Sequence, residues 1–472
     1  MAETWAKSVD LHLDLPGSRV RQGLESALRD AVRTGRLGPG TRLPSSRALA
    51  ADLGLARNTV AEVYSQLVAE GWLTARTGSG TSVAERRAAG PGPGPADRPE
   101  AAAPRYDLRA GAPDTSAFPR GAWLAASRKV LAAAPGQLLD YPDPRGLPQL
   151  RHALAGYLAR ARGVAADPAA IVICAGFAHG LAVTCAALRS AGAGTLAVEA
   201  YGHQAHRDLA TAAGLRLRLL PVDGSGAAIA QADGTDAALL TPAHQFPLGV
   251  TLHPQRRRAA ARWGGLVIED DYDGEFRYDR QPVGALQALA PDHVIYAGTA
   301  SKSLAPALRL GWLVVPPRLL DAVIAQLTAG PPGLDQLTLA EFISAGRYDR
   351  QIRRMRLAYR RRRDRLAAAL GRGGWRVTGI AAGLQAVVEL PGAEAERQLI
   401  ARAAGHGLAL QGLGSYRAEG SDDDRAGLVV GYGRPAEHAY TTALARLCAV
   451  LDGKVTGRAG AAAAATARPG TG

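Results

Sequence analysis

The sequence predicts two folded domains, a small winged helix-turn-helix domain followed by a large α/β domain. Residues 11–84 contain three amphipathic stretches and a β-prone hairpin, whereas residues 106–452 alternate short apolar runs with helical patterns. Between them, residues 85–105 carry alternating Pro and Gly, which block helices and sheet pairing, so we expect a linker there. Residues 453–472 lack an amphipathic pattern and are predicted to be a disordered tail.

Composition and charge restrict the class of protein. The 472 residues carry a formal net charge of +14, which favours an acidic partner such as DNA. Only four of the 56 basic residues are lysine, so codon bias toward arginine explains the charge equally well. The three cysteines form no CxxC pair, and no apolar run is long enough to span a bilayer. We therefore expect a cytoplasmic protein with no metal site and no membrane partner.

The N-terminal domain is predicted from helical spacing and turn residues. Apolar residues recur at helical spacing over residues 18–34, and Ser45 or Ser46 can cap a second helix that stops at Gly54. A third helix, ARNTVAEVYSQLVAEG, and two β-prone runs around Thr-Gly-Ser-Gly complete a winged helix-turn-helix.

The start of the third helix carries side chains that can read DNA. Arg57 can pair with guanine, Asn58 with adenine, and Thr59 with phosphate or a thymine methyl group. The preceding helix and the wing offer further contacts at Arg47, Arg76, Gly78 and Gly80. The alternative is a small helical domain whose arginines are only solvated. However, LRDAVRTGRLGPGTRLPSSRALAADLGLARNTVAEVYSQLVAEGWLTARTGSGTSV resembles the winged helix of the GntR family, which implies contacts to operator DNA at these residues.

One lysine stands out in the large domain. Lys302 is the only lysine in residues 130–453 and lies in GTASKSLAPALRLGW. A lysine that forms a Schiff base must be neutral when it attacks, which burial and a neighbouring cation favour. Arg309 can supply that cation or bind a phosphate, and Thr299 and Ser301 offer hydroxyls to the same anion. A surface lysine near a turn is the alternative.

Carboxylates end an apolar strand upstream, in GGLVIEDDYDGEFRY. Open α/β sheets bind ligands at the C-terminal ends of their strands. Asp270 can hold a protonated pyridine nitrogen, with Asp271 as the substitute, and Tyr272 can donate to a phenolic oxygen. CAGFAHG, residues 174–180, follows another strand, and its backbone N–H groups can cradle a phosphate.

Residues 106–452 resemble the fold-type-I aminotransferases, in particular the MocR subfamily, in which such a domain follows a GntR winged helix. The order YPDPRGLPQLRHALAGYLARARG, TPAHQFPLGVTLHPQRRR, IEDDYDGEFRY and GTASKSLAPALRLGW carries the resemblance. It implies pyridoxal phosphate bound as a Schiff base to Lys302, with Asp270 on the pyridine nitrogen and Tyr272 on the ring oxygen. It also implies a homodimer, and phosphate contacts from Gly176, Phe177, Thr299 and Arg309.

Three departures bear on function. Phe246 replaces the usual Asn before Pro, and in EAYGH His203 stands at the usual tyrosine position, with Tyr201 in place of a proline. Val429 replaces the arginine with which amino-acid-binding members hold a carboxylate. Arg425 and Arg434 could replace that arginine but are not in register, and a carboxylate would reach Arg207, Arg425 or Arg434 only through a rearranged loop.

Two functions fit these residues. The first is a DNA-binding transcription regulator that responds to a small-molecule effector, with pyridoxal phosphate itself as the signal and vitamin B6 metabolism as the regulated process. The second is a competent aminotransferase, and a regulator that responds to an amino acid or amine is a further alternative. The fused winged helix and Val429 favour the regulator, so we expect the aminotransferase-like domain to be regulatory.

Overall fold

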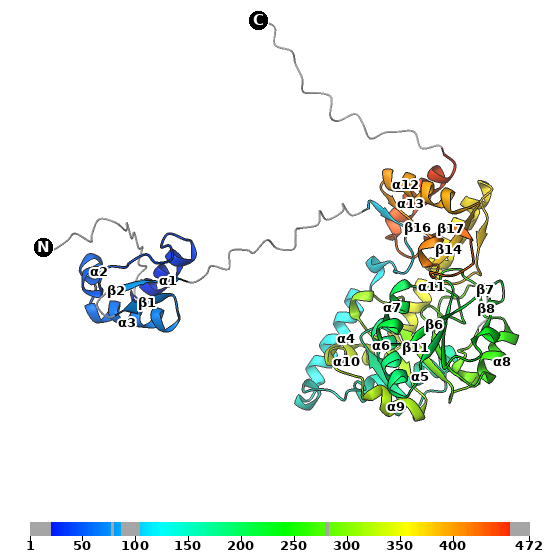
Figure 1. Ribbon diagram of the computed structural model, residues 1–472, viewed down its shortest axis with the longest axis horizontal. Helices are drawn as coiled ribbons and strands as arrows, with labels where there is room; N and C mark the ends of the chain where they lie inside the picture. Colours follow the sequence, from blue (N-terminus) through cyan, green and yellow to red (C-terminus); the bar gives the residue numbers. More distant parts are fainter. Residues whose placement is uncertain (1–19, 77–79, 86–103, 279–282, 454–472) are drawn as a thin grey trace, which may run out of the picture. The chain divides into compact units, whose positions relative to one another are not determined.

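The chain divides into two compact units, Met1–Ala102 and Ala103–Gly472 (Figure 1). The computed structural model describes residues 20–76, 80–85, 104–278 and 283–453. Most of the predicted linker, residue 78 of the wing and all but the first residue of the predicted tail therefore lie outside the described residues. Within the described ranges, no helix is both long enough and apolar enough to cross a membrane.

The N-terminal unit is a winged helix-turn-helix domain, as predicted. Its elements are α1 (Val20–Arg33), α2 (Ser46–Leu53), α3 (Arg57–Ala69), β1 (Leu73–Arg76) and β2 (Gly80–Val83), the last two paired antiparallel. Ser45 is the cap of α2, because its Oγ accepts the N–H of Ala48 at 3.1 Å, and Gly54 ends α2 at φ 65°. The apolar faces meet in a core that includes Leu24, Leu28, Leu49, Val60, Val63, Tyr64 and Leu67.

The large unit is built on a seven-stranded sheet. In spatial order its strands are β4 (Ile171–Cys174), β12 (Gly311–Val314), β11 (Val294–Thr299), β10 (Leu266–Asp270), β9 (Ala237–Leu240), β5 (Thr195–Glu199) and β6 (Arg216–Leu220). Neighbouring strands are parallel except where β12 pairs with β11 and β4. The predicted mostly parallel sheet is confirmed, with one antiparallel strand that the apolar runs did not announce.

Helices cover both faces of this sheet (Figure 1). Alternate strand residues divide between the faces, since Ile173 and Trp312 pack on one side and Val172 and Leu313 on the other. The first side is covered by α4 (Arg120–Ala133), α5 (Pro148–Arg162), α8 (Pro254–Arg262) and α10 (Gly333–Ser344). The second side is covered by α6 (Phe177–Ser190), α7 (Gln204–Ala212) and α9 (Pro317–Ile324).

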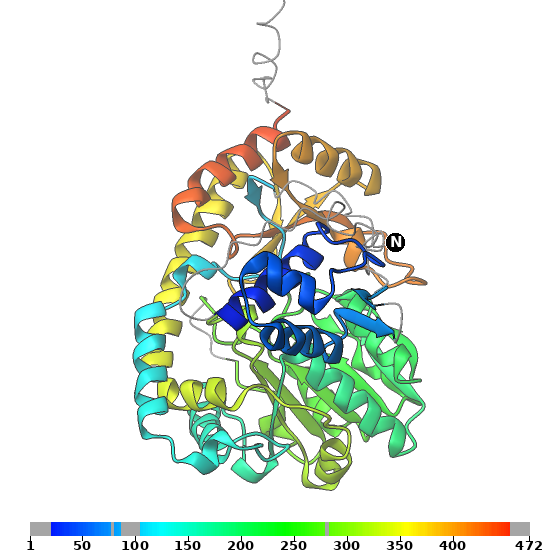
Figure 2. The same cartoon turned by 90° about the vertical axis from the view of Figure 1, so that its left-hand side faces the viewer.

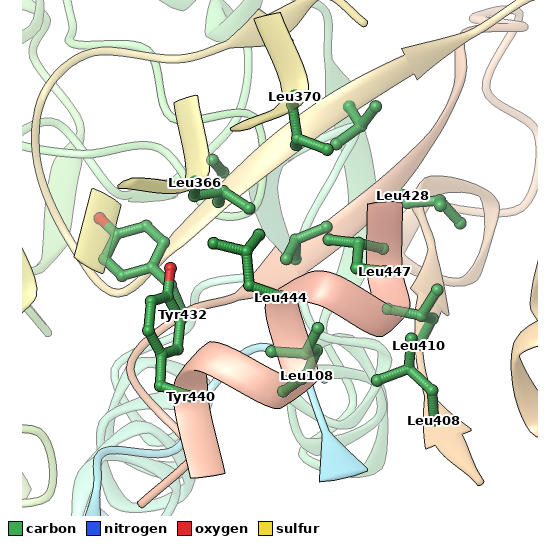
Figure 3. Packing of buried hydrophobic residues seen from close by; sticks show 14 of the residues in the cluster. Leu108, Leu366, Leu370, Leu408, Leu410, Leu428, Tyr432, Tyr440, Leu444 and Leu447 are labelled. Atoms are coloured by element: carbon green, nitrogen blue, oxygen red, sulfur yellow. The ribbon is translucent and has the colours of Figure 1, made fainter. Parts of the chain in front are cut away.

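A second, antiparallel sheet lies toward the C-terminus. Its strand order is β13 (Val377–Thr378), β14 (Gln385–Leu390), β17 (Ala426–Gly431) and β16 (Gln411–Gly412). The helices α11 (Arg347–Arg372), α12 (Ala393–Gly405) and α13 (Glu437–Leu451) pack leucines and tyrosines against it (Figure 3). The pairing of β3 (Tyr106–Asp107) with β15 (Leu408–Ala409) brings the start of the large unit into this layer.

Candidate functional site

A cavity of about 230 Å³ opens at the C-terminal ends of the strands of the large sheet. Glu199 ends β5, Asp270 ends β10, Thr299 ends β11, and Thr241 directly follows β9. Lys302, three residues after β11, lies in the same lining. Because open α/β sheets bind their ligands at this edge, the cavity is the candidate site that the sequence predicted.

Asp270 and Asp271 point in different directions, as successive residues of an extended segment do. Asp270 lines the cavity, and its buried Oδ1 has no hydrogen-bond partner among the described residues. Asp271 instead accepts Arg162 Nε at 2.6 Å and the Tyr296 hydroxyl at 2.8 Å. Burial raises the pKa of Asp270 well above its ordinary value, and the charge of Lys302 opposes this shift. A buried, unpaired carboxylate calls for a cationic N–H partner, and a protonated pyridine nitrogen fits.

The side chain of Lys302 lies in the cavity and donates to the carbonyl oxygen of Gly111. Burial lowers the pKa of Lys302, two neighbouring carboxylates oppose the shift, and Arg434 adds to it. The amine is therefore more often neutral, which is the form that attacks an aldehyde. Arg434 is a neighbouring cation that lowers the pKa of Lys302. Arg309 lines the same cavity and lies near the turn that precedes α6, where it donates to the carbonyl oxygen of Ala175.

The turn between β4 and α6 forms the anion end of the cavity. Gly176 has φ 80°, and the Arg309 guanidinium is 3.4 Å from the position that a Cβ of Gly176 would take. The N–H of Gly176 is bonded within the turn, while Phe177 and Ala178, the first residues of α6, line the cavity. The unbonded N–H groups of a helix start and its dipole both favour an anion. This helix start and Arg309 are the groups that would hold a phosphate.

Two hydroxyls lie beside this anion end. Thr299 Oγ1 is 2.9 Å from Ser301 Oγ and accepts the N–H of Ser301 at 3.2 Å. Both residues line the same cavity as Arg309. The structure thus brings together Phe177, Thr299, Ser301 and Arg309, all of which were predicted to contact one anion. Phe177 lies at least 122 positions before the other three in the sequence.

Tyr272 forms another wall of the cavity and belongs to a buried hydrogen-bond network. Its Oη accepts the side-chain N–H of Gln385 at 2.9 Å and lies 3.0 Å from His244 Nδ1. That nitrogen is also 2.8 Å from Asp273 Oδ2. Burial raises the pKa of Tyr272 well above 10, so the hydroxyl keeps its proton and can donate to a ring oxygen.

Two histidines close the cavity next to Phe246. His203 stacks on Phe246 with ring centroids 4.3 Å apart, and His206 lies 4.8 Å from Phe177. Burial lowers the pKa of His203 to about 4 and that of His206 to about 3, so both rings are neutral at neutral pH. These uncharged aromatic surfaces suit a flat ring such as a pyridine.

Val429 occupies the position at which the resemblance predicts a carboxylate-binding arginine. Val429 is fully buried in β17 and belongs to an apolar cluster with Phe246 and Tyr416. Three other arginines could pair with a carboxylate. One of them, Arg207, lines the cavity and donates to the Gln204 side chain and, at 3.2 Å, to the carbonyl oxygen of Tyr416. The other two arginines, Arg425 and Arg434, each pair with an aspartate that does not line the cavity.

Several cavity residues were not expected from the sequence. Glu199 is the most informative, because it is buried and accepts the Thr241 hydroxyl and the Gln245 side chain at 2.5 and 3.2 Å. Burial raises the pKa of Glu199 to about 7. Its place at the end of the strand in GTLAVEA is the signal that could have found it. The other unexpected residues include Gly111, Ala178, His206, Thr241 and Pro306.

The N-terminal unit exposes the residues predicted to contact DNA. Arg57 and Asn58 are exposed at the first turn of α3, Thr59 is half-buried, and Arg47 is exposed on α2. Ala56 caps α3 without a side-chain hydrogen bond, and the first turn has no acidic residue, so nothing there repels a phosphate. Arg76 and Gly80 face each other across the wing hairpin, and residue 78 lies outside the described residues.

Comparisons with known proteins match both units. Residues 21–83 match the bacterial regulatory proteins of the gntR family, and residues 106–420 match aminotransferase class I and II. A pyridoxine biosynthesis regulator, PdxR of Corynebacterium glutamicum, is 32% identical over 90% of this chain and 94% of its own. The probable rhizopine catabolism regulatory protein MocR of Rhizobium meliloti is 33% identical over 75% and 77%. An archaeal alanine:glyoxylate aminotransferase shares the fold of the large unit, with a TM-score of 0.66 at 24% identity over 74% of this chain and 91% of its own.

Proposed function

The chain belongs to the MocR-type branch of the GntR family, helix-turn-helix transcription regulators with a pyridoxal-phosphate-binding aminotransferase domain, and on this premise we propose that cofactor occupancy controls its DNA binding. The observation that carries the proposal is the cavity that joins Lys302 to an unpaired, buried Asp270 carboxylate. Pyridoxal phosphate supplies an aldehyde that a lysine amine can attack and a pyridine ring that withdraws electrons.

The described residues can satisfy each polar part of this cofactor. Asp270 would hold the protonated ring nitrogen, and Tyr272, whose hydroxyl stays protonated, would donate to the ring oxygen. The phosphate would lie at the start of α6 with Arg309 and the paired hydroxyls of Thr299 and Ser301. Lys302 would hold the aldehyde carbon. These four contacts account for every charged group of the cofactor.

A sensing role is favoured over a catalytic one by the apolar wall beside the ring. An amino-acid substrate would bring a carboxylate, and an unpaired carboxylate in a buried site costs several kcal/mol. Phe246 lines the cavity and packs with the buried Val429 and Tyr416, and none of the three offers the carboxylate a charge. The alternative, a competent aminotransferase, is supported by the intact lysine and aspartate. Turnover separates the two, because only an aminotransferase converts an amino donor and a keto acid through many cycles.

We propose that pyridoxal phosphate is itself the effector. Its polar groups are all matched by the cavity, whereas an amino-acid carboxylate would depend on Arg207 or on rearrangement of Arg425 or Arg434. The 32% identical relative PdxR is named for regulation of pyridoxine biosynthesis, which supports control of vitamin B6 supply as the regulated process. Such control would couple cofactor abundance to transcription.

A homodimer is proposed as the form that binds DNA, because regulators with a helix-turn-helix read two half-sites as pairs. Exposed apolar side chains on α4 and in the segment that follows it support a homodimer. Leu124 and Leu131 on α4 and Leu139 and Tyr141 just after it are all exposed, Tyr141 at 96%. Exposed aromatic and leucine side chains that gather in one segment are typical of an interface.

Substitution of the first residue of α3 tests the proposed DNA contact. Arg57→Ala should cost about 1–3 kcal/mol on a duplex selected by the full-length protein from random-sequence DNA, if Arg57 pairs with guanine. Arg76→Ala should weaken all duplexes alike and reduce the salt slope by about one unit. Fluorescence anisotropy on selected and unselected duplexes measures both effects.

Arg33→Ala is the matched control, since Arg33 is exposed on α1 and pairs with Asp30. It should leave the affinity for both duplexes unchanged. Equal losses for Arg57→Ala on selected and unselected DNA would show that Arg57 contacts only phosphate.

A further inference from the structure

One helix of the large unit presents an almost continuous arginine surface. Eleven of the 26 residues of α11 are arginine and two, Asp349 and Asp364, are aspartate, so the helix carries a formal charge of +9. Figure 2 shows α11 in yellow along one edge of the large unit. Eight of these arginines are exposed. Six of the eight recur at helical spacing, and we name them the arginine stripe: Arg350, Arg353, Arg354, Arg360, Arg361 and Arg365.

The two acids of α11 leave most of the stripe unneutralised. Asp349 pairs with Arg160 of α5 at 3.4 Å, and Asp364 approaches Arg360 at 3.9 Å. Arg353 and Arg361 make no hydrogen bond or ion pair with any described residue. Like charges three and four residues apart destabilise a helix by a few tenths of a kcal/mol per pair. The stripe is therefore unfavourable in the free unit and calls for an anionic partner.

Structural roles account for the buried arginine of α11 and for only part of the stripe, in which Arg354 donates to the carbonyl oxygen of Ala117 and Arg365 to Thr441 Oγ1. Arg362 is buried and pairs with Asp114 at 2.9 Å and Glu437 at 2.7 Å. Arg347 donates to the carbonyl oxygen of Ala122. These side chains hold α11 against its neighbours. A general bias toward arginine codons does not explain why the exposed face of α11 holds so many arginines and so few acidic residues.

We propose that the arginine stripe contacts the phosphates of double-stranded DNA beyond the site that the winged helix reads. This inference rests on the proposed function, because the winged helix of the same chain brings DNA to the large unit and raises its effective concentration there. From Arg350 to Arg365 the stripe is roughly 22 Å long. A duplex carries one charge per about 1.7 Å of its axis, so several phosphates match that length.

The test compares duplex lengths with full-length protein. The stripe variant is Arg350→Gln, Arg353→Gln and Arg361→Gln together, and the control variant is Arg216→Gln, Arg258→Gln and Arg262→Gln, three exposed arginines of β6 and α8. The probes are random-sequence duplexes of about 20 and about 60 base pairs, and the shorter is just long enough for a pair of winged helices one turn apart. On the longer duplex the stripe variant should bind about tenfold more weakly, with a salt slope smaller by two to three units, roughly one per lost phosphate.

The control variant loses the same charge and should bind both duplexes as the unmodified protein does. Equal losses in the two variants would attribute the effect to net charge and overturn the assignment. Undiminished binding of the stripe variant to the longer duplex would also overturn it, while leaving the winged-helix contact intact. A stripe variant that keeps its DNA affinity and loses binding to phosphatidylserine vesicles would assign the stripe to a membrane surface instead. Failure of the unmodified protein to bind either duplex would refute this inference and the proposed function together.

Discussion

Lys302→Ala should abolish the covalent attachment of pyridoxal phosphate. Among the described residues Lys302 is the only lysine that lines the cavity, its pKa is lowered by burial, and its amine lies at the edge where Asp270 ends β10. Without an amine at this position the cofactor is held only by its ring and phosphate contacts. The absorbance of the bound cofactor and borohydride reduction followed by peptide mapping measure the loss, which we expect to be complete.

Lys129→Ala is the control for this variant, since Lys129 lies on α4, is exposed and pairs with Glu341 at 2.8 Å. It should keep the full amount of reducible adduct. Circular dichroism should show that both variants remain folded. Recovery of the reduced label on Lys7, Lys129 or Lys454 in the unmodified protein would contradict the assignment of Lys302.

Two adjacent aspartates should respond in opposite ways to the same substitution. Asp270→Asn removes a carboxylate that has no hydrogen-bond partner at Oδ1, so we expect the cofactor-free protein to keep its stability within about 1 kcal/mol. Its affinity for pyridoxal phosphate should fall about a hundredfold, equivalent to roughly 3 kcal/mol, because the ring nitrogen loses its charged partner. Asp271→Asn breaks a buried ion pair with Arg162 and should destabilise the fold by about 3–5 kcal/mol.

Urea unfolding of the cofactor-free variants and equilibrium titration with pyridoxal phosphate measure the two effects separately. Each variant serves as the other's control, since the substitutions are one residue apart and make the same chemical change. A large loss of stability in Asp270→Asn with unchanged cofactor affinity would assign Asp270 a structural role. If Asp271→Asn instead kept its stability and lost affinity for pyridoxal phosphate, the roles of the two residues would be exchanged.

Local chemistry made the central residues of the site predictable. Lys302 is conspicuous because lysine is otherwise missing from residues 130–453, and Asp270 because it ends an apolar strand. The choice between Asp270 and Asp271 needed the structure, since both stand at the same strand end and only the direction of each side chain separates them. The capping of α2 by Ser45 and Gly54 was readable because caps act over three or four residues.

Long-range pairing hid the rest. Gly111 meets Lys302 across 191 positions, and Gln385 meets Tyr272 across 113, with no periodicity in between that reveals either contact. The antiparallel β12 was missed because a buried strand reads as the same apolar run whichever way it points. The separate C-terminal sheet was missed because its strands are short and lie among helices. The arginine-rich α11 was visible as composition, but its unneutralised face became evident only once exposure and ion pairs were known.

A titration of the cofactor-free protein shows whether cofactor occupancy sets DNA affinity. Cofactor-free protein is titrated with pyridoxal phosphate while the anisotropy of a labelled, protein-selected duplex and the absorbance of the bound cofactor are followed together. We predict that DNA affinity changes in parallel with the fraction of protein that holds the cofactor. At the same concentrations the DNA affinity of Lys302→Ala should not change. A panel of amino acids added to the cofactor-loaded protein should barely alter its DNA affinity. DNA affinity that ignores pyridoxal phosphate but responds saturably to one amino acid, with the response lost in Arg207→Ala, Arg425→Ala or Arg434→Ala, would contradict this prediction.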